Sequence, residues 1–212
     1  MSGSNTWESE AVTQTRTVIG VATAVACATF AASCALNRPE VKSLRDHDAN
    51  RIRIETPIET TIAALNAIPA HCRPSRDHRI RDEEFHVYQV IGRIGRVTHE
   101  PDHDIHIVLE DPDNPRAHLI VESDDPDFGR NVQSPYRDKF VVARHMVDEL
   151  VRQSGARELK DLRGLVVRVT GVGFFDLNHL QVGRSRSCIE LHPILEIERV
   201  SEFSPARFQA VD

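Results

Sequence analysis

The chain has 212 residues, with 26 basic and 32 acidic side chains and a formal net charge of −6. This length predicts one globular domain with appendages, and the 40% of apolar residues provide a core and exclude a wholly disordered chain. The acidic balance and the 5% of aromatic residues argue against generic binding to nucleic acid, either by charge or by base stacking.

The N-terminal region contains an uncharged, apolar run over residues 17–36, which is long enough to span a membrane. Its small residues fit a signal peptide cleaved after Ala35, and we therefore expect a secreted, periplasmic or envelope-anchored protein. An uncleaved anchor that tethers the protein through residues 17–36, and an Ala-rich buried helix, remain alternatives. Residues 1–36 are accordingly assigned as a signal peptide or membrane anchor.

Residues 37–82 are mostly polar and are interrupted by several prolines, which is typical of a linker. One short helix is expected over Glu59–Ala67, where apolar residues fall along one side and Pro69 stops continuation. We expect this helix to dock onto the main domain. Cys72 lies in the same segment, and in an oxidising compartment it either forms a disulfide with Cys188 or stays a free thiol.

Strands are expected from residue 85 onward. The first, residues 85–97, is long and β-branched, and Gly92 and Gly95 permit the coiling or bulge that a strand needs when it serves two sheets. Shorter strands follow at residues 104–110 and 117–122, separated by a Pro- and Asp-rich turn.

A helix and two more strands complete the predicted domain. Ser134-Pro135 is a typical helix start, Ser154-Gly155 a typical end, and between them apolar residues recur at spacings of three, four and three. The remaining strands are residues 165–172 and 189–197.

The element order β-β-β-α-β-β predicts a mainly β domain with one or two helices, an OB-like five-stranded barrel over residues 83–200, followed by a tail at 201–212. A ferredoxin-like sandwich is the competitor. It would need a helix between the first two strands, where the sequence has only six polar residues.

Metal-ligating residue types recur at strand spacing in two places. Asp104 and His106 share one face of the second strand, with Asp102 joining them if the strand extends, and Glu190 and His192 share one face of the last strand. Carboxylates and imidazoles bind divalent metals, so we predict a metal site from these residues and the loop residue His179, listed together as Asp104, His106, His179, Glu190 and His192. The alternative is that both strands simply present polar, solvated outer faces.

A second candidate site lies in the loop before the last strand. Phe175 could stack on a ring, and Asp176, Arg184 and Arg186 could hold a polar or anionic ligand. The alternative is that a phenylalanine closes the barrel end while the charges are solvated.

OB topology brings the loop between the first two strands and the loop between the last two to the same end of the barrel. The third strand nevertheless lies between the second and the fifth, so outward side chains on those two are expected to be about 10 Å apart.

The C-terminal two-thirds of the chain resembles a family of small, uncharacterised bacterial proteins that are usually exported. The resemblance covers about residues 58–198 and rests on Phe174-Phe175-Asp176, His179 and Ile189-Glu190-Leu191-His192-Pro193. The chain departs from the family pattern at Leu180 and at Ser185-Arg186-Ser187. The resemblance implies export and a single domain, without implying an activity.

We therefore expect an extracytoplasmic, monomeric OB-like binding module for a small or oligomeric ligand that the sequence does not identify. A divalent metal is the only cofactor that the residues suggest. The alternatives are a metal-dependent hydrolase acting on a phosphodiester or similar substrate, and a stabilising partner in an envelope complex.

Overall fold

The computed structural model of the chain describes residues 38–74, 78–177 and 182–201. The predicted N-terminal segment, and the predicted tail apart from Ser201, lie outside these residues. Within these ranges, no helix is both long and apolar enough to cross a membrane. The elements, in chain order, are α2 (Pro39–Lys42), η1 (Ala49–Arg51), β1 (Ile58–Glu59), α3 (Ile62–Ala67), η2 (Asp82–Phe85), β2 (Val87–His99), β3 (Ile105–Glu110), β4 (His118–Ser123), η3 (Asn131–Gln133), α4 (Arg137–Ser154), η4 (Leu159–Leu162), β5 (Val166–Phe175) and β6 (Ile189–Arg199).

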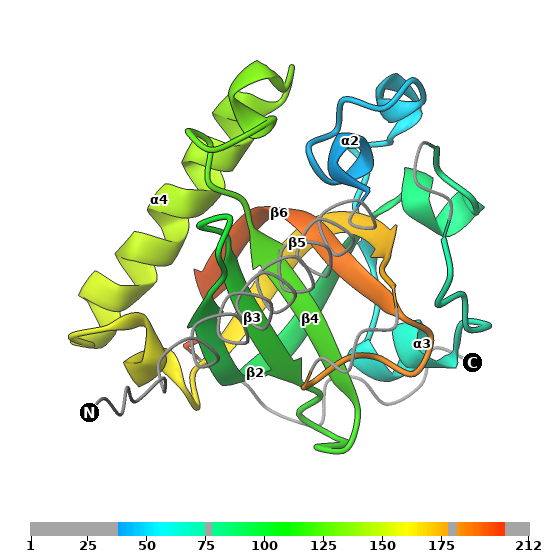
Figure 1. Ribbon diagram of the computed structural model, residues 1–212. Coiled ribbons are helices and arrows are strands. Elements are labelled where there is room, and N and C mark those ends of the chain that lie inside the picture. The colour runs from blue at the N-terminus through cyan, green and yellow to red at the C-terminus, as the bar shows by residue number, and fades with distance from the viewer. Residues whose placement is uncertain (1–37, 75–77, 178–181, 202–212) are drawn as a thin grey trace, which may run out of the picture. The chain divides into compact units, whose positions relative to one another are not determined.

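Five strands close into a barrel (Figure 1). The sheet order is β1-β2-β3-β4-β6-β5, and β2 pairs again with β5, which closes the circle. Neighbouring barrel strands are antiparallel except for β4 and β6, which run parallel, and α4 lies in sequence between β4 and β5. This order and closure define an OB barrel, so the predicted fold is confirmed and the ferredoxin-like alternative is wrong.

The long strand β2 serves both halves of the barrel. Residues 87–93 pair with β5, residues 93–99 pair with β3, and the register shifts between Ile94 and Arg96. Gly95 therefore lies in the bulge that the sequence predicts. At Gly92, a Cβ atom would lie only 2.9 Å from Leu109 Cβ, so a side chain there would disrupt the sharply coiled strand.

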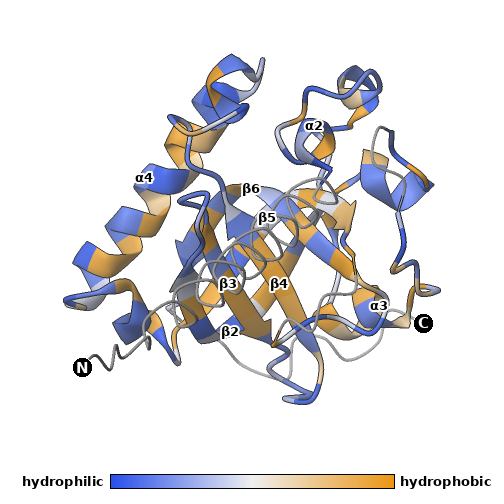
Figure 2. Cartoon of the chain, viewed as in Figure 1, coloured by the Kyte–Doolittle hydropathy of each residue, from blue (hydrophilic) through white to orange (hydrophobic). Residues whose placement is uncertain are grey.

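The barrel core follows from strand alternation. Apolar side chains at every second position of β3 and β4 face inward, and Figure 2 shows these strands as mostly hydrophobic. One face of α4 packs onto this core through Ala143, Val147 and Leu150, at the predicted spacing. The helix begins at Arg137, three residues after Ser134, because Ser134 is extended and its hydroxyl accepts a hydrogen bond from Tyr136 N in a turn before the helix.

The predicted linker is largely part of the folded domain. β1 adds two residues in parallel to β2, and α3 follows with Thr61 as its N-cap. The helix therefore begins three residues later than Glu59, which belongs to the strand. Ile62 and Leu65 of α3 are buried in the barrel core, as docking of this helix requires.

Residues 38–52 also pack on the barrel, and they do so from the outside. Arg38 makes two contacts with Glu84, at 2.5 and 3.1 Å, and donates to Phe175 O on β5. Arg79 makes a second buried ion pair with Asp46, at 2.9 Å. A separate apolar cluster joins this segment to α4 and to the outer face of the sheet, and it contains Leu44, Ala49, Ile52, Val87, Phe140, Val172 and Leu195.

One disulfide joins the segment after α3 to the start of β6. Cys72 and Cys188, 116 positions apart, are bonded to each other, so the question that the sequence left open is answered in favour of the bridge. Ser187 next to Cys188 also accepts a backbone hydrogen bond from His71 N, at 3.0 Å.

Candidate metal centre

Three neighbouring strands deliver polar side chains to one point on the outer face of the barrel. Asp104 directly precedes β3 and Asp124 directly follows β4, and the antiparallel register of Ile105 with Ser123 places the two aspartates opposite each other. His192 lies on β6, whose parallel pairing with β4 puts it on the same face.

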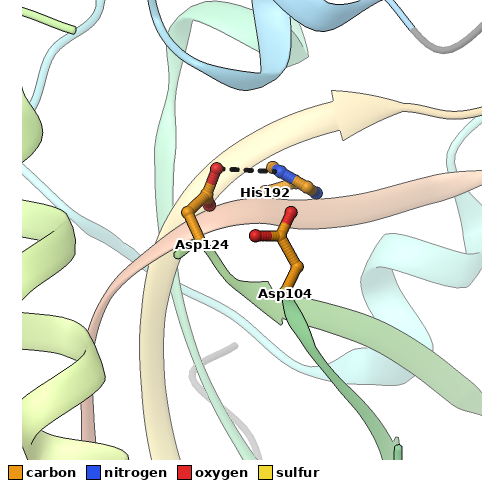
Figure 3. A group of neighbouring side chains, drawn as sticks. All are labelled: Asp104, Asp124 and His192. Atoms are coloured by element: carbon orange, nitrogen blue, oxygen red, sulfur yellow. Dashed lines mark hydrogen bonds and ion pairs between the residues drawn. The ribbon is translucent and has the colours of Figure 1, made fainter. Parts of the chain in front are cut away.

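The three side chains converge tightly (Figure 3). One possible ligand atom from each of Asp104, Asp124 and His192 lies within 4.8 Å of the other two, and the residues are only 5%, 2% and 1% exposed. His192 Nε2 is 3.3 Å from Asp124 Oδ1, and Asp104 Oδ1 accepts a hydrogen bond from Asp125 N at 2.7 Å. Asp124 Oδ2 is buried and has no hydrogen-bond partner among the described residues. Both carboxylates and the imidazole therefore have ligand atoms available at one buried point.

Glu122 contacts His192 on the ring nitrogen that is not near Asp124, and it also contacts Lys42 and His106. Its Oε2 lies 2.6 Å from His192 Nδ1 and 3.3 Å from Lys42 Nζ, and its Oε1 lies 2.9 Å from His106 Nδ1. A carboxylate on one ring nitrogen of a histidine fixes the ring and leaves the other nitrogen directed at a metal. In this arrangement, Nδ1 of His192 lies beside Glu122, and Nε2 lies beside Asp124.

The surroundings of Glu122 and His192 favour opposite charges on the two. Burial alone would raise the pKa of Glu122, but Lys42 and His192 hold that pKa well below its ordinary value. Burial alone would lower the pKa of His192, but the carboxylates of Asp124 and Glu122 raise it well above its ordinary value. Without a metal, this site therefore holds a charged imidazolium between two carboxylates.

Two other acids cannot ionise readily. Burial, together with the neighbouring Asp124 carboxylate, raises the pKa of Asp104 to about 8. Burial and the carboxylates of Asp176 and Glu122 raise the pKa of Glu190 well above its ordinary value. Neither carboxylate oxygen of Glu190 has a hydrogen-bond partner among the described residues. Asp104 and Glu190 therefore favour their neutral, protonated forms.

The structure brings together part of the predicted metal set. Asp104 and His192 converge, whereas His106 is directed at Glu122 and acts on the group only through it. Glu190 is buried nearby but does not belong to the converging trio, and His179 lies outside the described residues. The alternative of solvated outer faces is wrong, because residues from β3 and β6 on this face are buried.

Asp124 is not among the predicted metal ligands, and its position closes the gap of about 10 Å that was expected between the second and last barrel strands. It follows the central strand and reaches both of its neighbours. The signal was present in Val121-Glu122-Ser123-Asp124, where two acids occupy alternate positions at the end of a predicted strand. Lys42 was not predicted to lie near the site either, because residues 37–82 were expected to be a linker.

The predicted ligand-binding residues do not form one pocket. Phe175 points into the barrel core, because it alternates with Phe174, whose ring packs 5.5 Å from that of His192 on the outer face. Asp176 is buried, Arg184 contacts the disulfide, and Arg186 is exposed. The alternative, in which a phenylalanine fills the barrel, describes Phe175 better than ring stacking at the surface.

Comparisons with known proteins describe likeness only at the level of the barrel. No family model matches the sequence, and no curated protein matches it significantly. An asparaginyl-tRNA synthetase from Entamoeba histolytica aligns at 12% identity and a TM-score of 0.36, over 71% of this chain and 25% of that one. An OBody bound to hen egg-white lysozyme aligns at 12% identity and a TM-score of 0.35, over 57% of this chain and 88% of that one.

The S. pombe Stn1-ten1 complex aligns at 15% identity and a TM-score of 0.34, over 69% of this chain and 79% of that one. The chain spans only about a quarter of the length of the synthetase. The OB assignment therefore rests on the strand order and closure described above.

Proposed function

We propose that this protein is an extracytoplasmic OB-like binding module that holds a divalent metal ion at Asp104, Asp124 and His192. The observation that carries the proposal is the buried convergence of two carboxylates on one imidazole nitrogen, within 4.8 Å. A bound cation would take the place of the protons that the metal-free site holds on Asp104 and His192. Glu122, at the opposite ring nitrogen, supplies the support that histidine ligands of metals commonly have.

The donor set favours a transition metal such as Mn²⁺ or Zn²⁺. Ca²⁺ takes six to eight oxygen ligands and Mg²⁺ keeps several waters, whereas mixed oxygen and nitrogen donors suit first-row transition ions. One imidazole and two carboxylates meet that preference. Binding would displace a proton from Asp104, because its pKa of about 8 keeps it protonated at neutral pH, and a second proton from the His192 imidazolium, whose pKa is raised well above its ordinary value.

The burial of the centre favours a metal ion that stays bound without meeting a substrate over a catalytic metal ion of a hydrolase. A hydrolase must bring its substrate and a water into contact with the metal. All three proposed ligands are 5% exposed or less, so a phosphodiester would meet a closed protein surface. We therefore favour the binding module over the metal-dependent hydrolase.

Three observations support an extracytoplasmic location. Disulfides such as Cys72–Cys188 persist in oxidising compartments and are rare in the cytosol. The apolar run at residues 17–36 fits an export signal or anchor. The resemblance to an exported family points the same way. Detection of the mature N-terminus by mass spectrometry, after cell fractionation, tests this part of the proposal.

Metal binding is tested on the purified full-length chain after treatment with EDTA and dialysis. We expect one equivalent of Mn²⁺ or Zn²⁺ by calorimetry and elemental analysis, and a stabilisation of about 3 kcal/mol when the free metal is a hundredfold above Kd. Asp124→Asn should abolish both effects. Asp113→Asn, which changes an exposed aspartate in the β3–β4 turn, should bind like the wild type. Equal metal binding by Asp124→Asn and the wild type would refute the site.

A further inference from the structure

A guanidinium group lies directly against the disulfide. Arg184 Nη1 is 2.7 Å from Cys188 Sγ and 3.7 Å from Cys72 Sγ. A cation at this distance stabilises a neutral disulfide only weakly, whereas it stabilises a thiolate strongly. The contact therefore suits the reduced form of the pair better than the oxidised form.

The two sulfurs also differ in access. Cys188 is fully buried at the start of β6, whereas Cys72 is only partly buried in the segment after α3. An incoming thiolate reaches Cys72 more readily, and the sulfur that leaves is then the one beside Arg184. Access and charge thus favour the same direction of attack.

We propose that Cys72–Cys188 is a thiol-exchange site, at which the thiolate of a small or protein thiol attacks Cys72 and displaces Cys188 as a thiolate held by Arg184. The S–S bond breaks, a mixed disulfide forms on Cys72, and the bonding pair leaves on Cys188 Sγ. A second external thiolate then attacks the external sulfur, the bond between that sulfur and Cys72 Sγ breaks, and Cys72 leaves as a thiolate that takes up a proton. The external thiol is oxidised to its disulfide, and the cysteine pair gains two electrons.

The Arg184 guanidinium favours this exchange in two ways. It lies 2.7 Å from Cys188 Sγ and so stabilises the negative charge on the departing thiolate, and a better-stabilised thiolate leaves faster. It also stabilises the reduced pair, which makes the disulfide a stronger oxidant, as a stabilised reduced form does in disulfide oxidoreductases. A bridge with a purely structural role gains nothing from either effect.

The local structure can keep Arg184 in place after the bond opens. Ser187 Oγ donates to Leu65 O at 2.8 Å, and Ser185 Oγ donates to Ile189 O at 2.7 Å. Both hydrogen bonds hold the backbone on either side of Cys188 in place, and neither of them involves a sulfur atom. The reduced protein should therefore retain the barrel and the contact between the Cys188 thiolate and the guanidinium.

The test equilibrates the full-length protein in glutathione redox buffers, quenches it by alkylation, and maps the peptides so that Cys72 and Cys188 are separated from Cys27 and Cys34. We expect Arg184→Gln to lower the equilibrium constant for reduction about tenfold, which is a potential about 30 mV more negative. Arg186→Gln, an exposed arginine in the same loop, is the matched control and should behave like the wild type. Trapped glutathione should be found on Cys72.

A second variant and a second readout keep the proposal testable if Arg184→Gln folds poorly. Arg184→Lys preserves the charge and should stay closer to the wild type than to Arg184→Gln. In the reduced protein, thiolate absorbance at 240 nm should appear at higher pH in Arg184→Gln than in Arg186→Gln, which a purely structural role would not produce. Equal reduction constants in all variants, or glutathione trapped on Cys188, would overturn the proposal.

Discussion

Replacing Asp104 with asparagine should stabilise the metal-free protein while removing its metal binding. The side chain is 5% exposed and faces the carboxylate of Asp124, and its pKa is raised from 3.8 to about 8. Asparagine keeps an oxygen that can accept the hydrogen bond from Asp125 N, but it carries no charge. The variant thus removes an unfavourable ionisation and little else.

The sign and size follow from the shifted pKa. Between about pH 4 and pH 8 the unfolded chain ionises at Asp104 while the folded chain keeps its proton, so wild-type stability falls as the pH rises through this window. The rise in the pKa of Asp104 from 3.8 to about 8 corresponds to at most about 5 kcal/mol of unfolding free energy at pH 8. Relaxation and water entry reduce such penalties to a few kcal/mol, so we expect a gain of about 2 kcal/mol.

Urea unfolding in EDTA at pH 4 and pH 8 measures the effect. The unfolding free energy of Asp104→Asn should be higher than that of the wild type at pH 8 and equal to it at pH 4. With saturating Mn²⁺ at pH 8, the wild type should instead be the more stable of the two. Asp113→Asn should show no pH-dependent difference from the wild type. An identical change in unfolding free energy at both pH values would show that Asp104 is not held protonated by its surroundings.

Three further substitutions test buried contacts elsewhere in the domain, each by urea unfolding monitored by circular dichroism. Arg38→Met should cost about 3–5 kcal/mol, because it leaves the buried Glu84 carboxylate without its guanidinium, and a loss below 1 kcal/mol would contradict this. Phe140→Ala should cost about 3–5 kcal/mol, because the ring is fully buried between α4 and the sheet. Gly173→Ala should cost about 1–3 kcal/mol, because its Cβ would lie 2.3 Å from Glu83 O, and a neutral result would show that the backbone yields there.

The barrel was predictable because each of its elements carries a local signal. Gly92 and Gly95 in a β-branched run predicted one strand that bends between two partners, and the structure has its register shift at Gly95. The spacing of Ala143, Val147 and Leu150 fixed the buried face of α4 before any contact was known. Helix starts were less accurate, because turns and a two-residue strand replaced the first residues of the expected helices.

The site was only half predictable, because it depends on which strands are neighbours and on what covers them. Alternation placed Asp104 and His192 on outer faces, but only the parallel pairing of β4 with β6 brings His192 beside Asp124. Nothing in the local pattern shows that Lys42, eighty positions before Glu122, would lie against it. Long-range charge pairing of this kind leaves no periodic pattern in the sequence. The polar faces of these strands could therefore equally be expected to be solvated, whereas in the structure they are buried.

The segment around α2 covers part of the outer surface of the barrel. OB barrels hold nucleotide or sugar chains on the surface of their second and third strands and on two adjoining loops. Here Lys42 covers part of that surface, because its ammonium group pairs with Glu122 on the third barrel strand. Arg38, in the same segment, donates a hydrogen bond to Phe175 O on β5. A tethered segment is always present at high effective concentration, so a polymer would have to displace it before binding to this part of the barrel surface.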